Sequence, residues 1–378
     1  MLHVHHINLQ QIVGGGEVFT HAMTRAFADA GARVTLYCHP DNRLWDDLPR
    51  ERVELARVAD EAALFARLPP RGALVVTEGP LSEDAIDRID EAHTYVAVAH
   101  LPIVAGRSAD TFKRCDLVFT VSRYCIGLLR DAGVVKLYPE PIFGTTEAQR
   151  GDGETIVARS PYQWDRRKFR DVLLGTLEPL LESLRRRQRF SRLPGLTLGV
   201  VSLLTTVKQF PLLFAAIAAQ LASRPQVRVE IFGNGGYAQV RDIRRALVPL
   251  ATRVRFWGYQ RNVHDIYPQL DYLLAGLPEK EALGLNVLEA QMCGTPVLAV
   301  DAPPFTETML HGRSGFLYRD PREDGGADFG RTLDDILAGA PRPDPRLLAA
   351  EHLRQFSYEA MVARARPLLA RMAELSPA

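Results

Sequence analysis

Short apolar runs alternate with amphipathic helical stretches along almost the whole chain. In the first half, apolar runs at residues 2–7, 34–38, 74–76, 95–99, 117–121 and 134–137 predict strands, and residues 17–30 carry apolar side chains at helical spacing. Strands joined through helices run parallel, because each crossover returns over a face of the sheet. The pattern predicts an α/β fold in which helices cover a mostly parallel sheet.

The second half repeats this pattern. Strands are predicted at residues 197–203, 227–232, 254–256, 272–275 and 297–300, with helices at 210–222, 238–249 and 286–293. A chain of 378 residues is too long for one typical core. We therefore predict two Rossmann-like domains, residues 1–145 and 196–357, joined by a basic linker at 146–195. The final helix, within residues 358–378, is a candidate to pack on the first domain.

Composition excludes several classes of protein. The 46 Lys and Arg nearly balance the 45 Asp and Glu, so no strong field favours nucleic acid as a partner. The four cysteines lack metal-ligand spacing, and free thiols in a reducing compartment are expected. No apolar run approaches the roughly 18 residues that span a bilayer. We expect a cytoplasmic protein, associated at most with the inner face of a membrane.

Two glycine-rich turns follow predicted strands. Gly14, Gly15 and Gly16 open the first helix, where free N–H groups attract phosphate. Phe19 stands where a dinucleotide fingerprint needs its third glycine, so the turn does not favour a nicotinamide site. The second turn, residues 233–236, includes Gly235. Each turn is either a phosphate-binding loop or a tight connection without a ligand.

Two glutamates form the most informative motif. Glu281 follows a predicted strand, at the edge where open α/β sheets bind ligands, and residues 282–285 lead into the next helix. Glu289 lies on that helix with largely apolar neighbours three and four positions away. Burying an unpaired carboxylate is costly, so Glu289 needs a partner. Ribose hydroxyls would satisfy it, and a buried ion pair with an arginine is the alternative.

These motifs resemble those of retaining GT-B glycosyltransferases of family 4, the glycosyl transferases group 1. The resemblance rests on the two glutamates with seven residues between them, on the first glycine turn, and on further stretches at residues 116–122, 254–258, 267–271, 294–297 and 301–315. It covers nearly the whole chain apart from residues 150–194. It implies the GT-B fold, in which two Rossmann-like domains face each other across a cleft.

The resemblance also implies roles in binding a nucleotide-sugar donor. Glu289 would bind the ribose, Glu281 the transferred sugar, and the N–H groups of Leu283, Gly284 and Leu285 the sugar hydroxyls or the diphosphate. Gly15 and Gly16 would face the diphosphate from the opposite domain, and Gly235 belongs to the second candidate turn.

Glu281 and two further residues would act in catalysis. Lys208 would neutralise the leaving phosphates, and His100 would lie on the acceptor side near the reacting carbon. The sequence shows no Asp-x-Asp motif, so we expect a metal-independent enzyme without a cofactor, in which fixed donors stabilise the leaving group. A UDP-sugar is the favoured co-substrate, and a GDP-sugar is the alternative.

The implied activity is hexosyl transfer to a glycan or lipid-linked acceptor in polysaccharide, lipopolysaccharide or glycolipid biosynthesis. One departure is Leu203, which stands where the family usually has an arginine. Either Lys208 suffices, or another arginine such as Arg166 or Arg167 reaches the phosphates. Leu203 also leaves open a non-catalytic GT-B partner subunit, and a sugar-nucleotide epimerase is a further alternative.

The basic segment at residues 166–192 has two interpretations. Its arginines alternate with an apolar series made by Phe169, Val172, Leu173, Leu177, Leu180, Leu181 and Leu184. This combination is typical of an interfacial helix attracted to anionic lipid. A solvated helix surface is the alternative.

Overall fold

The computed structural model describes residues 1–11, 13–104, 107–146, 151, 153, 155–164, 169–185, 188–348 and 350–376. The chain divides into two compact units. The first comprises Met1–Thr146 and Arg354–Ala378, and the second comprises Glu147–Leu353. The segment 146–195, predicted as a linker, thus belongs almost wholly to the second unit.

The first unit contains a six-stranded parallel sheet in the order β3-β2-β1-β4-β5-β6. Its elements are β1 (His3–Asn8), α1 (Gly15–Asp29), β2 (Arg33–Cys38), η1 (Arg43–Asp47), β3 (Val53–Arg57), α2 (Glu61–Phe65), β4 (Leu74–Thr77), α3 (Glu83–Ala92), β5 (Thr94–Ala99), α4 (Asp110–Arg114), β6 (Leu117–Thr120), α5 (Arg123–Asp131) and α13 (Tyr358–Leu375). The central strands are almost continuously buried, as expected when helices cover both faces.

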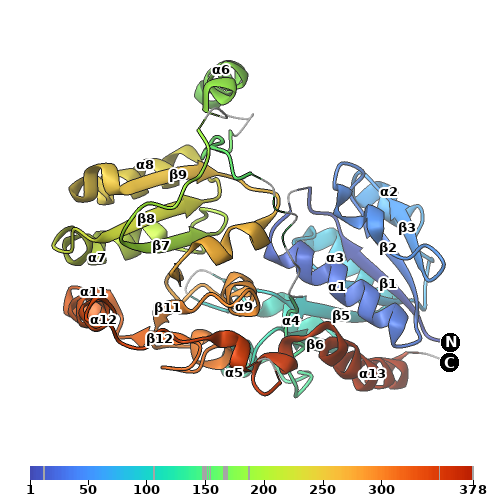
Figure 1. Cartoon of the computed structure of the whole chain (residues 1–378). Coiled ribbons are helices and arrows are strands. Elements are labelled where there is room, and N and C mark those ends of the chain that lie inside the picture. The colour runs from blue at the N-terminus through green and yellow to red at the C-terminus, as the bar shows by residue number, and fades with distance from the viewer. Residues whose placement is uncertain are drawn as a thin grey trace. The chain divides into compact units, whose positions relative to one another are not determined.

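The last helix, α13, packs on α1 of the first unit (Figure 1). The Tyr358 hydroxyl donates a hydrogen bond of 2.7 Å to Asp29 at the end of α1. The guanidinium of Arg25 lies 3.7 Å from the centre of the Tyr358 ring, which adds a cation–π contact. These contacts explain why the final helix joins a domain that began more than three hundred residues earlier.

The second unit contains another six-stranded parallel sheet, in the order β12-β11-β10-β7-β8-β9. Its elements are α6 (Phe169–Arg185), β7 (Leu196–Val201), α7 (Phe210–Ala222), β8 (Val227–Phe232), α8 (Tyr237–Ala246), η2 (Val248–Arg253), β9 (Val254–Gly258), η3 (Val263–Asp265), η4 (Tyr267–Gln269), β10 (Tyr272–Leu274), α9 (Leu285–Met292), β11 (Val297–Val300), α10 (Phe305–Thr308), β12 (Gly315–Tyr318), α11 (Pro321–Asp324), α12 (Ala327–Leu337) and η5 (Pro345–Leu348); η6 (Leu353–Phe356) spans the boundary between the units.

A strip of backbone before β7 attaches to the β9 end of this sheet. The N–H of Arg159 donates to the carbonyl of Trp257 at 2.9 Å, and Val157 forms an antiparallel bridge with Arg189. Helix α6 lies between these two stretches in the sequence and is connected back to them by side chains. The indole N–H of Trp164 donates to Glu178 at 3.1 Å.

The sequence pattern was wrong in one strand and missed two others. Residues 134–137 do not form a strand: only Leu137 bridges Val118, and Val135 is 87% exposed. The strands that were missed are β3, a short segment that includes Glu54 and Arg57, and β12, which opens on Gly315.

Candidate functional site

Lys208 and Glu281 meet beyond the carboxyl ends of two neighbouring strands of the second sheet. Lys208 follows β7, Glu281 follows β10, and β7 and β10 are hydrogen-bonded to each other. The Lys208 ammonium donates to a Glu281 carboxylate oxygen and forms an ion pair in which both side chains are largely buried. The structure thus brings together two of the residues predicted to act in catalysis.

The backbone that leads into α9 surrounds the same carboxylate. The N–H of Gly284 donates to Glu281 at 3.2 Å, and the N–H of Ala282 donates to it at 3.3 Å. Gly284 has a φ of 82°, a left-handed conformation that favours glycine, and an added Cβ would lie 3.1 Å from the Phe305 ring. The predicted donor-binding backbone at Leu283–Leu285 therefore lies next to Glu281, which already uses one of its N–H groups.

Glu289 lies on α9 and accepts a hydrogen bond of 2.7 Å from the hydroxyl of Tyr267. Burial raises the pKa of Glu289, although the Tyr267 hydrogen bond and the charge of Lys208 oppose this shift. Burial beside the carboxylate also raises the pKa of Tyr267. Among the described residues, Tyr267 is the hydrogen-bond partner of Glu289. The positive charge of Lys208 also acts on the Glu289 carboxylate.

Gly235 is fixed between two segments of backbone. Its N–H donates to the carbonyl of Pro161 at 3.0 Å, and its carbonyl accepts from the N–H of Gln163 at 2.8 Å. A Cβ at this position would lie 2.2 Å from the carbonyl oxygen of Leu204. Packing therefore explains why the residue is glycine. Its N–H is not available to a phosphate in this conformation, and a role of Gly235 in donor binding stays a prediction.

Arg159 is a residue that the sequence pattern missed. Its backbone pairs with Trp257 at the end of β9, on the same edge of the sheet as the Gly235 turn. The side chain is half-buried, and its Nε is buried without a hydrogen-bond partner among the described residues. An incompletely satisfied guanidinium at this edge is suited to an anion. Arg166 and Arg167, suggested from the sequence as substitute cations, lie outside the described residues.

In the first unit, the glycine turn forms the start of α1. Gly14 is the residue before the helix, and its N–H donates to the side chain of Glu17 at 2.8 Å. A Cβ on Gly16 would meet no heavy atom within 4 Å, so packing within the chain does not require glycine there. Gly15 and Gly16 begin the helix itself, and open space beside Gly16 is compatible with close approach of a ligand.

His100 belongs to a buried polar network at the carboxyl ends of β4 and β5. Its Nε2 donates to Glu78 at 2.6 Å, and its ring lies edge-on to Phe19, with the two ring centres 5.0 Å apart. The Nε2 of His6, on β1, donates to the other oxygen of Glu78 at 2.6 Å. Burial alone would raise the pKa of Glu78, but the charges and hydrogen bonds of His100 and His6 outweigh it and lower the pKa to about 2.

Sequence reasoning missed Glu78, although a signal for it exists. The residue follows directly after the buried strand β4, at the edge where open α/β sheets place functional groups. A charged residue in that position, with a side chain that is 0% exposed, needs a partner.

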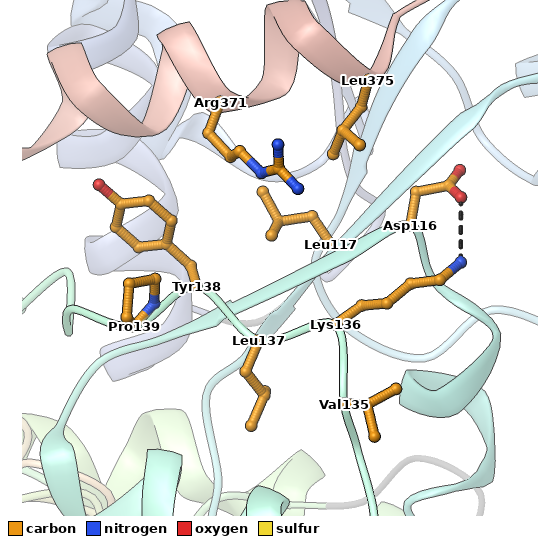
Figure 2. A pocket seen from close by; sticks show the side chains of 9 residues that line it. All are labelled: Asp116, Leu117, Val135, Lys136, Leu137, Tyr138, Pro139, Arg371 and Leu375. Atoms are coloured by element: carbon orange, nitrogen blue, oxygen red, sulfur yellow. Dashed lines mark hydrogen bonds and ion pairs between the residues drawn. The ribbon is translucent and has the colours of Figure 1, made fainter.

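A hollow of about 590 Å³ lies at the opposite edge of the first sheet (Figure 2). Asp116 and Leu117 line it at the start of β6, together with Tyr138 and Arg371. Asp116 pairs with Lys136 at 3.3 Å and accepts from the N–H of Tyr95, which ties the starts of β5 and β6. Because this is the amino edge of the strands, the hollow is separate from the predicted site residues.

The described residues show neither a metal centre nor a membrane-spanning helix. No group of three or more His, Cys, Asp or Glu side chains among them is arranged to hold a metal ion. None of the helices in the described ranges is both long and apolar enough to cross a bilayer.

Comparison with known proteins gives a consistent picture. A family model described as glycosyl transferases group 1 matches residues 195–337. A D-inositol 3-phosphate glycosyltransferase from Mycolicibacterium vanbaalenii is 27% identical over 290 residues, which cover 72% of this chain and 59% of that protein. One from Stackebrandtia nassauensis is 31% identical over 179 residues, which cover 43% of this chain and 39% of that protein. The chain thus spans less than two thirds of the length of these curated relatives.

Among solved structures, HepE from Anabaena in complex with UDP-glucose has a TM-score of 0.67 to this chain at 16% identity. The alignment covers 98% of this chain and all of the other. At this level of identity the likeness shows the fold alone.

Proposed function

We propose that this chain transfers a sugar from a nucleotide-sugar donor to a hydroxyl group of an acceptor, because residues 195–337 match the family model of glycosyl transferases group 1 and the chain has the GT-B fold. The observation that carries this proposal is the cluster of Lys208, Glu281 and Glu289 beyond the carboxyl ends of β7 and β10. The cluster lies inside the segment that the family model matches.

The donor would be held by this cluster in the second unit. Glu289 would accept hydrogen bonds from the ribose hydroxyls, with Tyr267 fixing its carboxylate. Glu281, steadied by the N–H groups of Ala282 and Gly284, would accept from the hydroxyls of the transferred sugar. We favour a UDP-sugar, since HepE was solved with UDP-glucose, and a GDP-sugar is the alternative.

Lys208 would stabilise the leaving group. Breaking the bond between the sugar and the nucleotide leaves negative charge on the diphosphate, and fixed positive groups aimed at that charge lower the barrier. Lys208 is held by Glu281, so it lies next to the expected position of the sugar. We propose that this lysine, together with backbone N–H groups, supplies the positive charge, and that neither a metal ion nor a cofactor is needed.

The stereochemistry and the acceptor are extensions of the same proposal. Retention of configuration follows from the family resemblance, with the leaving phosphate assisting attack on the same face. The acceptor would be a glycan or a lipid-linked glycan of a polysaccharide, lipopolysaccharide or glycolipid. The relatives named as D-inositol 3-phosphate glycosyltransferases are consistent with a polyhydroxylated acceptor.

We further propose that α6 contacts the inner face of a membrane. Phe169, Val172 and Leu173 expose 85%, 43% and 57% of their surface on its first turns, which favours burial in a lipid interface. Part of the positive charge is used internally, because Arg185 pairs with Glu178 and Arg192 with Asp271. Co-sedimentation with vesicles of anionic lipid should fall when Phe169 and Leu173 are both changed to serine. Equal sedimentation of both proteins would contradict the contact.

The transferase activity is tested with a panel of UDP- and GDP-sugars. A matching donor should raise the melting temperature and be hydrolysed slowly without acceptor. Lys208→Ala and Glu281→Ala should each lower turnover by about 10²- to 10³-fold. The neighbouring changes Lys280→Ala and Glu279→Ala serve as matched controls and should leave turnover near that of the wild type.

Other results would favour the alternatives. If no nucleotide sugar raises the melting temperature or is hydrolysed, the result would indicate a non-catalytic subunit. Leu203 at the usual arginine position is the observation that favours this alternative. Conversion of a donor into its epimer without acceptor would indicate an epimerase.

A further inference from the structure

Glu78 connects four segments of the first unit through a buried carboxylate. One oxygen accepts from the Nε2 of His6 on β1, and the other accepts from the Nε2 of His100 after β5, each at 2.6 Å. The hydroxyl of Thr20, on α1, also donates to Glu78. The side chains of Glu78 and His6 are 0% exposed, whereas that of His100 is 17% exposed. His100 is thus the member of the network that reaches the surface.

The hydrogen positions in this network follow from the chemistry of a carboxylate. An ionised carboxylate only accepts hydrogen bonds, so both imidazoles must donate to it through Nε2–H. The other nitrogen of His6, Nδ1, lies 2.8 Å from the hydroxyl of Thr24. The Nδ1 of His100 has no partner in the described part of the chain. When Nε2 carries the proton, the Nδ1 of His100 has a lone pair that can accept a hydrogen bond.

We propose that Glu78 is a positioning residue that holds His100 in the Nε2–H tautomer, so that its Nδ1 accepts a hydrogen bond from a sugar hydroxyl of the substrate. The inference rests on the proposed function and extends it to a residue with no assigned role. The hydroxyl belongs to the acceptor or to the transferred sugar, and kinetics distinguish these two sources. The proposal requires only that a hydrogen bond forms, with no transfer of a proton or group.

The position of the network supports this role. Glu78 and His100 follow the adjacent strands β4 and β5 at the carboxyl edge of the sheet, where open α/β folds bind ligands. Thr20 connects Glu78 to α1, four residues after Gly16, so the same carboxylate also anchors the helix of the first glycine turn. A merely structural hub would not need one of its histidines to be partly exposed with a free acceptor nitrogen.

The tautomer is measured directly by ¹⁵N NMR of the imidazoles in the full chain, with His100→Asn used to assign the His100 signals. At neutral pH the wild type should show Nε2–H for His100. In Glu78→Gln, the side-chain amide offers one acceptor and one donor in place of two acceptors, so the His100 or the His6 signals should change. An Nδ1–H tautomer of His100 in the wild type would overturn the proposal.

Kinetics test whether Glu78 acts through His100. Glu78→Gln should lower kcat/KM by about tenfold or more, and Glu78→Asp should recover part of the loss. Adding Glu78→Gln to His100→Asn should cause little further loss, because both changes remove one hydrogen bond to the substrate. The exposed Glu54→Gln in the same unit is the matched control and should behave as the wild type. Fully multiplicative losses in the double variant, or unchanged kinetics in Glu78→Gln, would overturn the proposal.

Comparing acceptor KM with donor hydrolysis identifies which substrate carries the hydroxyl. Comparing the kinetics with the NMR result separates this proposal from the proposed transferase function. A rise in acceptor KM with unchanged donor hydrolysis would assign the hydroxyl to the acceptor, and a loss of donor hydrolysis would assign it to the transferred sugar. If the wild type transfers no sugar at all, the proposed function fails. The NMR experiment still decides whether Glu78 fixes the tautomer of His100.

Discussion

Lys208 and Glu281 are 73 positions apart in the chain, yet their side chains form an ion pair beyond the ends of two neighbouring strands. The side chains are 20% and 12% exposed, so the pair is better shielded from water than a surface pair. In the proposed reaction the bond between the sugar and the diphosphate breaks. Lys208 would lie on the diphosphate side of that bond, and Glu281 on the side of the transferred sugar. A lysine held by an acid can exchange part of that contact for phosphate oxygens when the donor binds.

The first prediction concerns the energy of this pair. In a double-mutant cycle with Lys208→Met and Glu281→Gln, urea unfolding should give a coupling of about 1 kcal/mol. The more exposed pair of Lys136 and Asp116, studied with Lys136→Met and Asp116→Asn, should give a smaller coupling. Coupling indistinguishable from zero at Lys208 and Glu281 would mean that the contact does not order the free site.

The second prediction concerns the pH dependence of nucleotide binding. Burial raises the pKa of Glu289, so its carboxylate takes up a proton at a higher pH than an ordinary glutamate would. Ribose hydroxyls prefer the ionised form, and affinity for UDP should therefore fall as the pH falls through this raised pKa. Tyr267→Phe removes a hydrogen bond that lowers the pKa, so the loss should begin at a still higher pH. Calorimetric titration with UDP across this pH range measures both effects.

Tyr318→Phe is the control for this experiment, because the buried hydroxyl of Tyr318 has no hydrogen-bond partner in the described structure. It should leave the pH dependence of UDP binding unchanged. Identical curves for the wild type and Tyr267→Phe would argue against contact between Glu289 and the ribose.

A third prediction follows from the incompletely satisfied guanidinium of Arg159. If Arg159 supplies a cation that Leu203 does not, Arg159→Gln should weaken binding of UDP by about tenfold and reduce its dependence on salt. Arg189→Gln, an exposed change in the neighbouring stretch, should have little effect. Binding should be measured by titration at low and at physiological ionic strength. Equal affinities for the two variants would remove Arg159 from the site.

The fourth prediction compares two adjacent glycines. A Cβ on Gly235 would lie 2.2 Å from the Leu204 carbonyl, whereas a Cβ on Gly236 would meet no heavy atom within 4 Å. Gly235→Ala should lower the free energy of unfolding by roughly 2–3 kcal/mol, and Gly236→Ala should change it by less than about 0.5 kcal/mol. Denaturant unfolding measures both values. Similar stabilities would mean that the turn adapts to a side chain.

Much of the fold could be predicted from the sequence, because the buried strands of a parallel sheet consist mainly of apolar residues. β8 and β11 were predicted to the residue: β11 is an apolar segment, and β8 alternates apolar residues with Arg228 and Glu230 before its apolar end. Residues 134–137 also form a short apolar run, but they lie beyond β6, the last strand of this sheet in the described part of the chain, and Val135 remains in solvent. Apolar character alone does not distinguish a strand from a segment at the edge of a sheet.

Some residues of the candidate site could likewise be predicted from the sequence, and others could not. Glu281 and Glu289 were found because they belong to one short motif around a helix start, and Lys208 was named through the family resemblance. Glu78 was missed because its partners His6 and His100 lie 72 and 22 positions away. A network that forms only when β1, β4 and β5 lie side by side leaves one local sign in the sequence, a charged residue directly after a buried strand, and no sign of its partners.

The pairing of Pro161 and Gln163 with Gly235 uses backbone atoms alone. The side chain of Gln163, which is exposed, can therefore change without loss of these contacts. Substitutions at such a position can vary the chemistry of the surface beside this turn, while the backbone that holds the turn stays in place.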